Sequence, residues 1–169
     1  KRVTTAGSIP PQRVVVPSTM VDFIVVEPEQ WQTTETPYDP AISGEIRRPF
    51  SSFPPVEFGP EKVIARRAAL ELHAGDAVNL GFGISPIVPY ILIEENQAEA
   101  VTWVIEQGAV GGVPLDGFAF GCSANAQAII PSSTQFTYFQ SGGEDCGLLS
   151  FMEVSSEGDV NVSRLAMKP

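Results

Sequence analysis

A strand, glycine-loop, helix, strand pattern between residues 77 and 105 constrains the fold of this chain most. Residues 77–80 form a short apolar run that ends in a glycine loop, and residues 101–105 form a second, β-branched run. Between them, two prolines suit the first turn of a helix whose apolar face includes residues 91–93. Since parallel strands need a crossover connection, this order predicts an α/β fold with an open, mostly parallel sheet and flanking helices.

The sequence on both sides of this pattern predicts further helices and strands of the same α/β architecture. Residues 62–73 have the spacing of an amphipathic helix that ends near His73, the only histidine of the chain. We expect a short helix over 125–130, a strand or helix over 136–139, and two final strands, separated by a turn. These final strands are expected at 148–154 and 159–162.

The N-terminal third has a different composition. Ten of the fifteen prolines lie between residues 10 and 60. Within this region, residues 13–16 and 21–26 are β-rich runs that predict short strands. Residues 28–60 have no sustained apolar period but carry several aromatic side chains, which favour burial. We therefore expect a connecting segment that lies against a folded surface without regular structure.

Charge and cysteine usage exclude several classes of function. The chain has a net charge of −10, and no lysine or arginine occurs between residues 68 and 163, where twelve of the twenty acidic residues lie. A nucleic-acid surface needs clustered cations, so this stretch does not bind nucleic acid. Cys122 and Cys146 lack metal-site spacing and have no histidine nearby, which indicates buried thiols in a reducing cytoplasm. No apolar run has the length of a membrane span, and no secretory signal is evident.

Glu106 is the candidate reactive residue. It follows a run of five apolar or β-branched residues and precedes Gln107 and Gly108. Ligands of open α/β sheets bind at the carboxyl ends of strands, and a carboxylate beside glycine can be approached closely. On position alone, an ordinary solvated residue at a strand end is the better explanation of Glu106.

The sequence around Glu106 resembles the active-site segment of family I coenzyme A (CoA) transferases. Glu106 stands in VIEQG at 104–108, which is followed by GGVP at 111–114. Further blocks match the family in the same order along the chain. They are VDFIVV at 21–26, YDP at 38–40, SGEIR at 43–47, IARRAA at 64–69, NLGFGI at 79–84, FG at 120–121, AII at 128–130, GG at 142–143 and GDVNVS at 158–163.

The resemblance implies a domain organisation. Residues 1–27 would be the terminal strands of a preceding CoA-binding half, and residues 28–60 would be the linker. Residues 61–169 would be the glutamate-bearing catalytic α/β domain, an incomplete domain that is truncated at its C-terminus. The chain is thus expected to be a fragment, inactive alone, of an enzyme in which the missing CoA-binding half is a partner.

The resemblance also implies a reaction. CoA would pass between an acyl-CoA and a short-chain carboxylate through a glutamyl-CoA thioester on Glu106. Gly111 and Gly112, with Gly81 and Gly83, would shape the CoA-binding surface, although a tight turn with positive φ explains Gly111 and Gly112 as well. No metal and no cofactor are expected beyond CoA as substrate. A cytoplasmic homo-oligomer in ketone-body or short-chain fatty acid metabolism is implied.

Two other functions fit parts of the sequence. An acyl-CoA hydrolase would use the same glutamate and let water resolve the intermediate. A non-catalytic effector module of the same fold, similar to sugar-phosphate sensors and isomerases, would need cations near its loops to hold phosphate. The stretch from 68 to 163 offers none.

Overall fold

The N-terminal region contains short turns of 3-10 helix. The computed structural model describes residues 3–164, and the chain divides into two compact units, Lys1–Asp39 and Pro40–Pro169. In the first unit, η1 covers Pro11–Arg13 and η2 covers Ser18–Met20. Each follows a proline, and η1 itself begins with Pro11, whose fixed φ suits the first turn of a helix.

The strands expected at 13–16 and 21–26 are wrong for this chain as described. No strand lies within residues 3–39, and the side chains of Phe23 and Val25 are 91% and 89% exposed. A strand needs a neighbour to accept and donate its backbone hydrogen bonds, and the described part of this unit supplies none. High β propensity alone was therefore insufficient to make residues 13–16 and 21–26 form strands.

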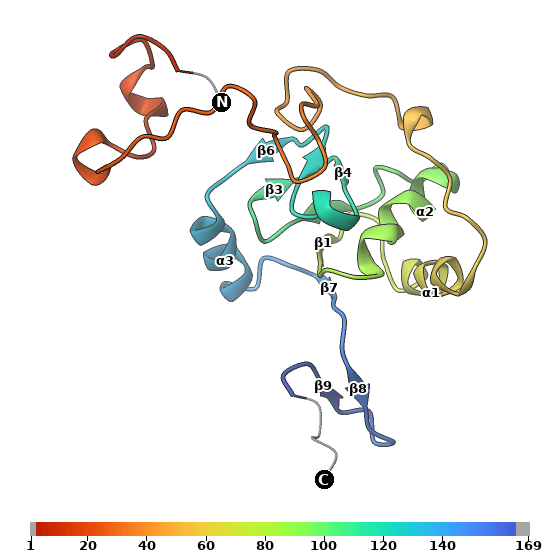
Figure 1. Cartoon of the computed structure of the whole chain (residues 1–169). Helices are drawn as coiled ribbons and strands as arrows, with labels where there is room; N and C mark the ends of the chain where they lie inside the picture. The colour runs from red at the N-terminus through yellow and green to blue at the C-terminus, as the bar shows by residue number, and fades with distance from the viewer. Residues whose placement is uncertain (1–2, 165–169) are drawn as a thin grey trace. The chain divides into compact units, whose positions relative to one another are not determined.

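The second unit is built around a five-stranded sheet with the strand order β6-β3-β2-β1-β7 (Figure 1). Short antiparallel pairs, β4–β5 and β8–β9, accompany it. The strands are β1 Ala77–Leu80, β2 Thr102–Val104, β3 Ala109–Val110, β4 Val113–Pro114, β5 Ser123–Ala124, β6 Ala128–Ile129, β7 Cys146–Leu148, β8 Glu153–Val154 and β9 Val160–Asn161. The helices are η3 Phe50–Ser52, α1 Pro60–Ala69, η4 Ser85–Ile87, α2 Val88–Glu94, η5 Gly117–Ala119 and α3 Ser132–Gln140.

The sheet is mixed. Strand β1 pairs in parallel with both β2 and β7, whereas β3 pairs antiparallel with β2 and with β6. The expected α/β class with parallel strands and flanking helices is confirmed, but the antiparallel half was not expected. It arises because a tight turn joins β2 to β3, and so short a connection permits only antiparallel pairing. The helix expected over 125–130 is wrong, since β6 lies there.

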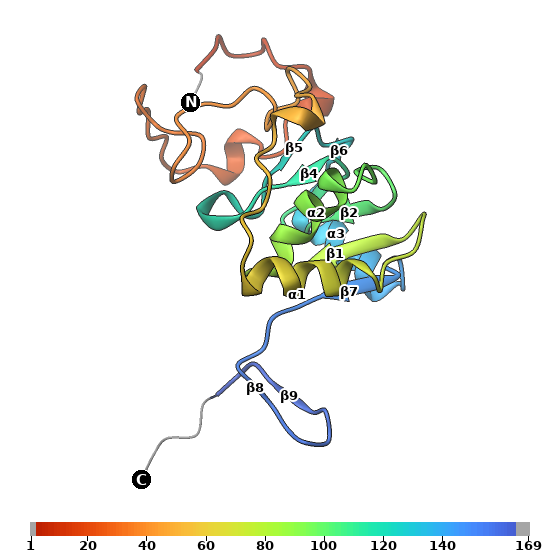
Figure 2. The same cartoon turned by 90° about the vertical axis from the view of Figure 1, so that its right-hand side faces the viewer.

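Helices cover both faces of this sheet. In Figures 1 and 2, α1 and α2 lie on one face and α3 lies on the other. The helices expected near 62–73 and 91–93 are present as α1 and α2, and residues 136–139 belong to α3. Pro86 and Pro89 occupy the first turns of η4 and α2, as their fixed φ predicts.

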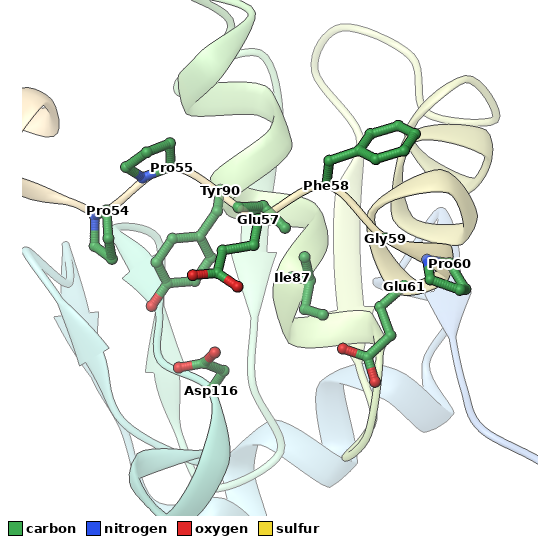
Figure 3. Close-up of a pocket in the computed structure, with 11 residues that line it drawn as sticks. Pro54, Pro55, Glu57, Phe58, Gly59, Pro60, Glu61, Ile87, Tyr90 and Asp116 are labelled. Atoms are coloured by element: carbon green, nitrogen blue, oxygen red, sulfur yellow. The ribbon is translucent and has the colours of Figure 1, made fainter.

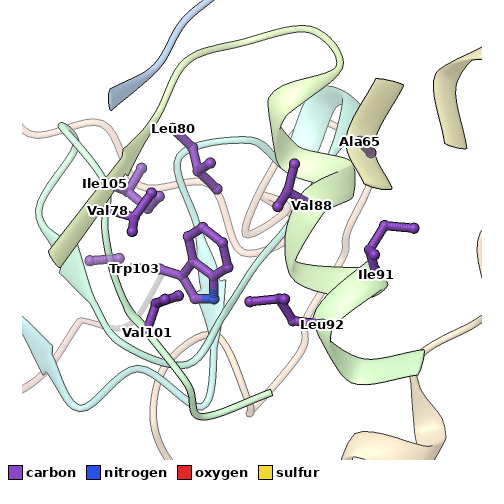
Figure 4. Packing of buried hydrophobic residues seen from close by; sticks show 10 residues of the cluster. Ala65, Val78, Leu80, Val88, Ile91, Leu92, Val101, Trp103 and Ile105 are labelled. Carbon is purple, nitrogen blue, oxygen red and sulfur yellow. The ribbon is translucent and has the colours of Figure 1, made fainter. Parts of the chain in front are cut away.

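The main core lies between the sheet and the α1–α2 layer. Trp103 is 1% exposed, and Figure 4 shows its indole among Leu80, Val101 and Leu92. Val78 belongs to the same cluster. Because side chains alternate along a strand, the residues between these core positions point to the opposite, α3 face.

The segment from residue 40 to residue 59 packs as expected, without regular structure apart from η3. Ala41 and Phe53 are buried in a second cluster, where the Phe53 ring meets Tyr90 edge-on at 6.1 Å. Asn125 clamps the segment. Its Oδ1 accepts a hydrogen bond from Arg48 N at 2.7 Å, and its Nδ2 donates to Arg48 O at 2.8 Å. Phe58, by contrast, is 91% exposed.

Candidate active site

Glu106 lies at the tip of a tight turn that joins β2 to β3. The turn is closed by Gly108 N, which donates to Ile105 O at 2.8 Å, and by Ile105 N, which donates to Ala109 O at 2.8 Å. Gly108 has φ +114°, and a Cβ there would lie 1.9 Å from Ile130 O. Only glycine satisfies both conditions. The half-buried Glu106 thus sits two residues beyond the carboxyl end of a parallel strand.

The carboxyl ends of three parallel strands form the edge from which Glu106 emerges. Since β1 pairs in parallel with β2 and β7, the loop after β1 and the segment after β7 lie at this edge too. Gly81 N donates to Leu148 O at 2.9 Å, and Ser150 Oγ donates to Phe82 O at 2.6 Å. The first glycine loop is therefore held in place at the same edge as Glu106.

The four candidate glycines separate into two places. Gly81 and Gly83 lie in the loop after β1, at the edge of Glu106. Gly111 and Gly112 lie in the β3–β4 connection, where Gly111 N donates to Trp103 O at 2.7 Å. Trp103 lies within β2, whereas Glu106 lies in the turn two residues beyond the end of that strand. The structure therefore does not bring Gly111 and Gly112 to the tip of the turn.

Local geometry explains why residues 111 and 112 are glycine. Their φ values are +71° and +75°, and a Cβ at Gly112 would lie 2.2 Å from Ala124 O. A Cβ at Gly111 would lie 2.7 Å from Gln127 Cγ. A tight turn with close backbone approach accounts for both residues.

Ser132 is a site residue that the sequence reasoning missed. Its Oγ donates a hydrogen bond of 2.8 Å to the main-chain oxygen of Glu106. Ser132 is the first residue of α3, so this helix starts directly against the Glu106 turn. The proline at 131 followed by two serines is a signal for a helix start and could have located it.

The carboxylate of Glu106 has one described side-chain partner, because Gln107 Nε2 donates to its Oε1 at 3.2 Å. The Gln107 side chain in turn lies against Gly121, whose ideal Cβ would be 3.0 Å from Gln107 Cδ. The adjacent Phe120 ring meets Phe82 edge-on at 5.7 Å. An apolar aromatic pair and a glutamine amide thus connect the first glycine loop to the Glu106 turn.

The three cations of α1 are paired with carboxylates. Lys62 Nζ lies 2.7 Å from Glu94 Oε2, and its hydrogen bond is the main cause that holds the pKa of Glu94 below its usual value. Arg66 pairs with Glu95 at 3.0 Å, and Arg67 pairs with Glu71. These cations are already paired with the carboxylates of Glu71, Glu94 and Glu95, so they are poorly suited to hold the phosphates of CoA.

The pocket shown in Figure 3 is acidic and does not include the candidate residues. It has a volume of about 610 Å³ and is lined by residues 54–61 with Ile87, Tyr90 and Asp116. Burial, and secondarily the charge of Asp116, raise the pKa of Tyr90 to about 12. Glu57, Glu61 and Asp116 line this pocket, so it disfavours an anionic ligand.

The two cysteines and the histidine are not part of a reactive cluster in the part of the chain that the structure describes. Cys122 and Cys146 are free, and burial raises the pKa of both thiols, which lowers their reactivity. His73 is exposed beyond the end of α1, 3.7 Å from Asp76. Within residues 3–164, no group of three His, Cys, Asp or Glu side chains could hold a metal ion. The helices described here are all too short or too polar to cross a bilayer.

Sequence comparison places this geometry in context. No protein-family model matches the chain. A caffeate CoA-transferase of Acetobacterium woodii is 37% identical over 164 residues, which cover 95% of this chain. The acetate CoA-transferase YdiF of Escherichia coli K12 is 32% identical over 165 residues, which cover 97% of this chain. The chain spans about 31% of the length of these curated relatives.

Comparison with solved structures gives the same relationship. The chain is similar to the YdiF acyl-CoA transferase of E. coli O157:H7, solved as a thioester complex with CoA, with a TM-score of 0.79 and 30% identity. The match covers 96% of this chain and 31% of that one. The fold and the sequence similarity therefore define an α/β segment of the acyl-CoA transferase type. The chain belongs to the CoA-transferase family.

Proposed function

We propose that this chain is the glutamate-bearing segment of an enzyme that transfers CoA between an acyl-CoA and a carboxylic acid. The position of Glu106 carries the proposal. It lies just beyond the carboxyl end of a parallel strand, within the VIEQG sequence that resembles the family's active-site segment. Gly108 and the hydrogen bond from Ser132 hold its turn in place. The similarity to a YdiF thioester complex with CoA supports the same reading.

The chemistry follows from a carboxylate nucleophile. The Glu106 carboxylate attacks the acyl-CoA carbonyl, forms a mixed anhydride and releases CoA thiolate. The thiolate then attacks the glutamyl carbonyl, which gives a glutamyl-CoA thioester and frees the first acid. A second carboxylate reverses both steps and leaves with CoA. Each step exchanges one acyl bond for another, so no electrons are transferred and no redox cofactor is needed.

Backbone N–H groups near Glu106 suit the tetrahedral intermediates. The Gly81 N–H is already bonded to Leu148 O. The N–H groups of Phe82 and Gly83 donate to no acceptor within residues 3–164. Gly83, with φ +118°, keeps the loop free of a Cβ that would meet Ser150 Oγ at 2.6 Å. We assign the stabilisation of negative charge to this loop, and a turn-forming role to Gly111 and Gly112.

The rest of the enzyme would complete the site. Residues 1–27 would belong to a CoA-binding half that precedes this segment, residues 28–60 would link the halves, and residues 61–169 would belong to the catalytic half. The cations of α1 are paired with carboxylates, so the other half would hold the CoA phosphates. We infer a cytoplasmic homo-oligomer. The acceptor would be a short-chain carboxylate, in line with the acetate CoA-transferase name of a relative.

A chimera tests the proposal. This chain would replace the matching segment of E. coli YdiF, and intact mass would be measured after incubation with acetyl-CoA. A CoA adduct that borohydride reduces is expected, and Glu106→Gln should abolish it. Glu99→Gln, which removes an exposed carboxylate before β2, should leave the adduct unchanged. An adduct that persists in Glu106→Gln, or that maps to another residue, refutes the assignment.

The same chimera separates the transferase from the hydrolase. Acid release that requires an added acceptor carboxylate indicates CoA transfer. Release at the same rate without an acceptor indicates that water resolves the intermediate.

A further inference from the structure

Gln135 is a fully buried amide that the described hydrogen bonds leave unexplained. Its side chain is 0% exposed, and it is the one buried residue of α3. Neither its Oε1 nor its Nε2 has a hydrogen-bond partner in the described part of the chain. A buried amide without partners is costly, and such groups commonly mark a bound water or a functional constraint.

A second orphaned amide oxygen faces the same layer. Val78 and Leu80 belong to the core on the α1–α2 side, so Asn79 between them points to the α3 side. Its Oδ1 is buried and has no partner within residues 3–164. The only buried residue of α3 is Gln135, and it faces the sheet from the other side of this layer. By strand alternation and burial, these two unpartnered amides belong to the facing sides of the layer between the sheet and α3.

This layer lies directly beneath the Glu106 turn. Asn79 is in register with Val104, which is two residues before Glu106 on the adjacent strand. Gln135 is one helical turn after Ser132, whose hydroxyl binds the Glu106 main chain. Side chains in a helix point back toward its N-terminus, so Gln135 points from α3 toward the level of Ser132.

We propose that Gln135 is a positioning residue for Glu106. With Asn79 it forms a buried polar site between the sheet and the first turns of α3, where one ordered water bridges the two amides. This site holds the start of α3 against the Glu106 turn. Gln135 is too deeply buried to touch a substrate. The effect of Gln135 on catalysis depends on the proposed role of Glu106 as the nucleophile.

Hydrogen exchange of the full chain, measured by NMR, tests the proposal without any catalytic assay. The reporter is the Gly108 amide, because its bond to Ile105 O closes the Glu106 turn. Gln135→Leu keeps the side-chain volume but removes both polar atoms. It should accelerate Gly108 exchange by about tenfold, while the Val78 amide of the core strand keeps its protection. Gln140→Leu, an exposed position on the same helix, is the matched control and should change neither rate.

Two further variants protect the test against a folding defect. Asn79→Leu should accelerate Gly108 exchange as well, and the double variant should add little to the larger single effect, because both residues serve one site. Gln135→Glu should preserve Gly108 protection at low pH, where a neutral carboxyl both donates and accepts. It should lose that protection as the carboxyl ionises at higher pH, after correction for intrinsic exchange.

Three results would overturn the proposal. They are unchanged Gly108 exchange in both single variants, equal acceleration of Gly108 and Val78, and strictly additive effects of the two substitutions. Each would mean that the two amides are ordinary buried groups without a shared site. Since exchange does not depend on chemistry at Glu106, these outcomes are independent of whether the chimera forms a CoA adduct.

Discussion

The hydroxyl of Ser132 donates a hydrogen bond of 2.8 Å to the main-chain oxygen of Glu106, across 26 residues of sequence. This contact joins the start of α3 to the tip of the β2–β3 turn. It leaves the Glu106 carboxylate free to react while its backbone is fixed. Since a nucleophile must be held within a fraction of an ångström of its reacting geometry, the contact should affect rate more than stability.

The Ser132 contact gives the first prediction. Ser132→Ala in the YdiF chimera should slow glutamyl-CoA formation by about fivefold, because a hydrogen bond of this kind contributes about 1 kcal/mol. Ser133→Ala removes the neighbouring exposed hydroxyl and should leave the rate unchanged. Equal rates for the two variants, followed by intact mass over time, would count against a role for the contact.

The second prediction concerns Gly108. Gly108→Ala should lower the unfolding free energy by about 4 kcal/mol or more, because its Cβ would clash with Ile130 O at a positive φ. Gly117→Ala is the control. Gly117 has φ +57° but nothing within 4 Å of an added Cβ, so only about 1 kcal/mol of backbone strain is expected. Urea unfolding would measure both, and similar losses would show that the close approach is unimportant.

The third prediction concerns pH. The hydrogen bond from Lys62 lowers the pKa of Glu94, so this pair stabilises the folded state above the unfolded pKa of Glu94 and loses that effect as pH falls through the folded value. Glu94→Gln should cost about 1 kcal/mol near pH 7. The difference from wild type should shrink below the ordinary carboxyl pKa of 4.5. Thermal unfolding across pH 3 to pH 7 would measure it, and a constant difference would contradict the mechanism.

The fourth prediction is that the chain alone binds CoA poorly. CoA carries several phosphate charges, whereas α1 has paired cations and residues 68–163 have none. Calorimetric titration should give a dissociation constant weaker than about 1 mM. The chimera should bind measurably. Tight binding by the chain alone would refute the division of labour between the two halves.

The fifth prediction tests the proposed domain organisation. The run 21–26 has strong β propensity but no strand partner among residues 3–39. In the chimera, where a CoA-binding half is present, the amides of Phe23 and Val25 should become protected from hydrogen exchange. The chain alone should show little protection at these residues. The same low protection in both would contradict the assignment of residues 1–27 to that half.

Local sequence patterns were enough to predict the helices and strands that depend on short-range interactions. The apolar run 77–80 became β1, and Pro86 and Pro89 placed the helix start, because strand alternation and the fixed φ of proline act over a few residues. Glu106 was found at a strand end for the same reason. The run at 21–26 shows the limit, because β propensity cannot supply a partner strand.

The sequence by itself determined the α/β class, the positions of β1 and β2, and the residue at the tip of the candidate site. Tertiary structure decided the rest. The antiparallel pairing of β3 with β6, the pairing of Arg66 with Glu95, and the contact from Ser132 to Glu106 depend on residues that are distant in sequence. Hydrogen bonds and steric limits between such residues exist only once the chain is folded, so no local pattern encodes them.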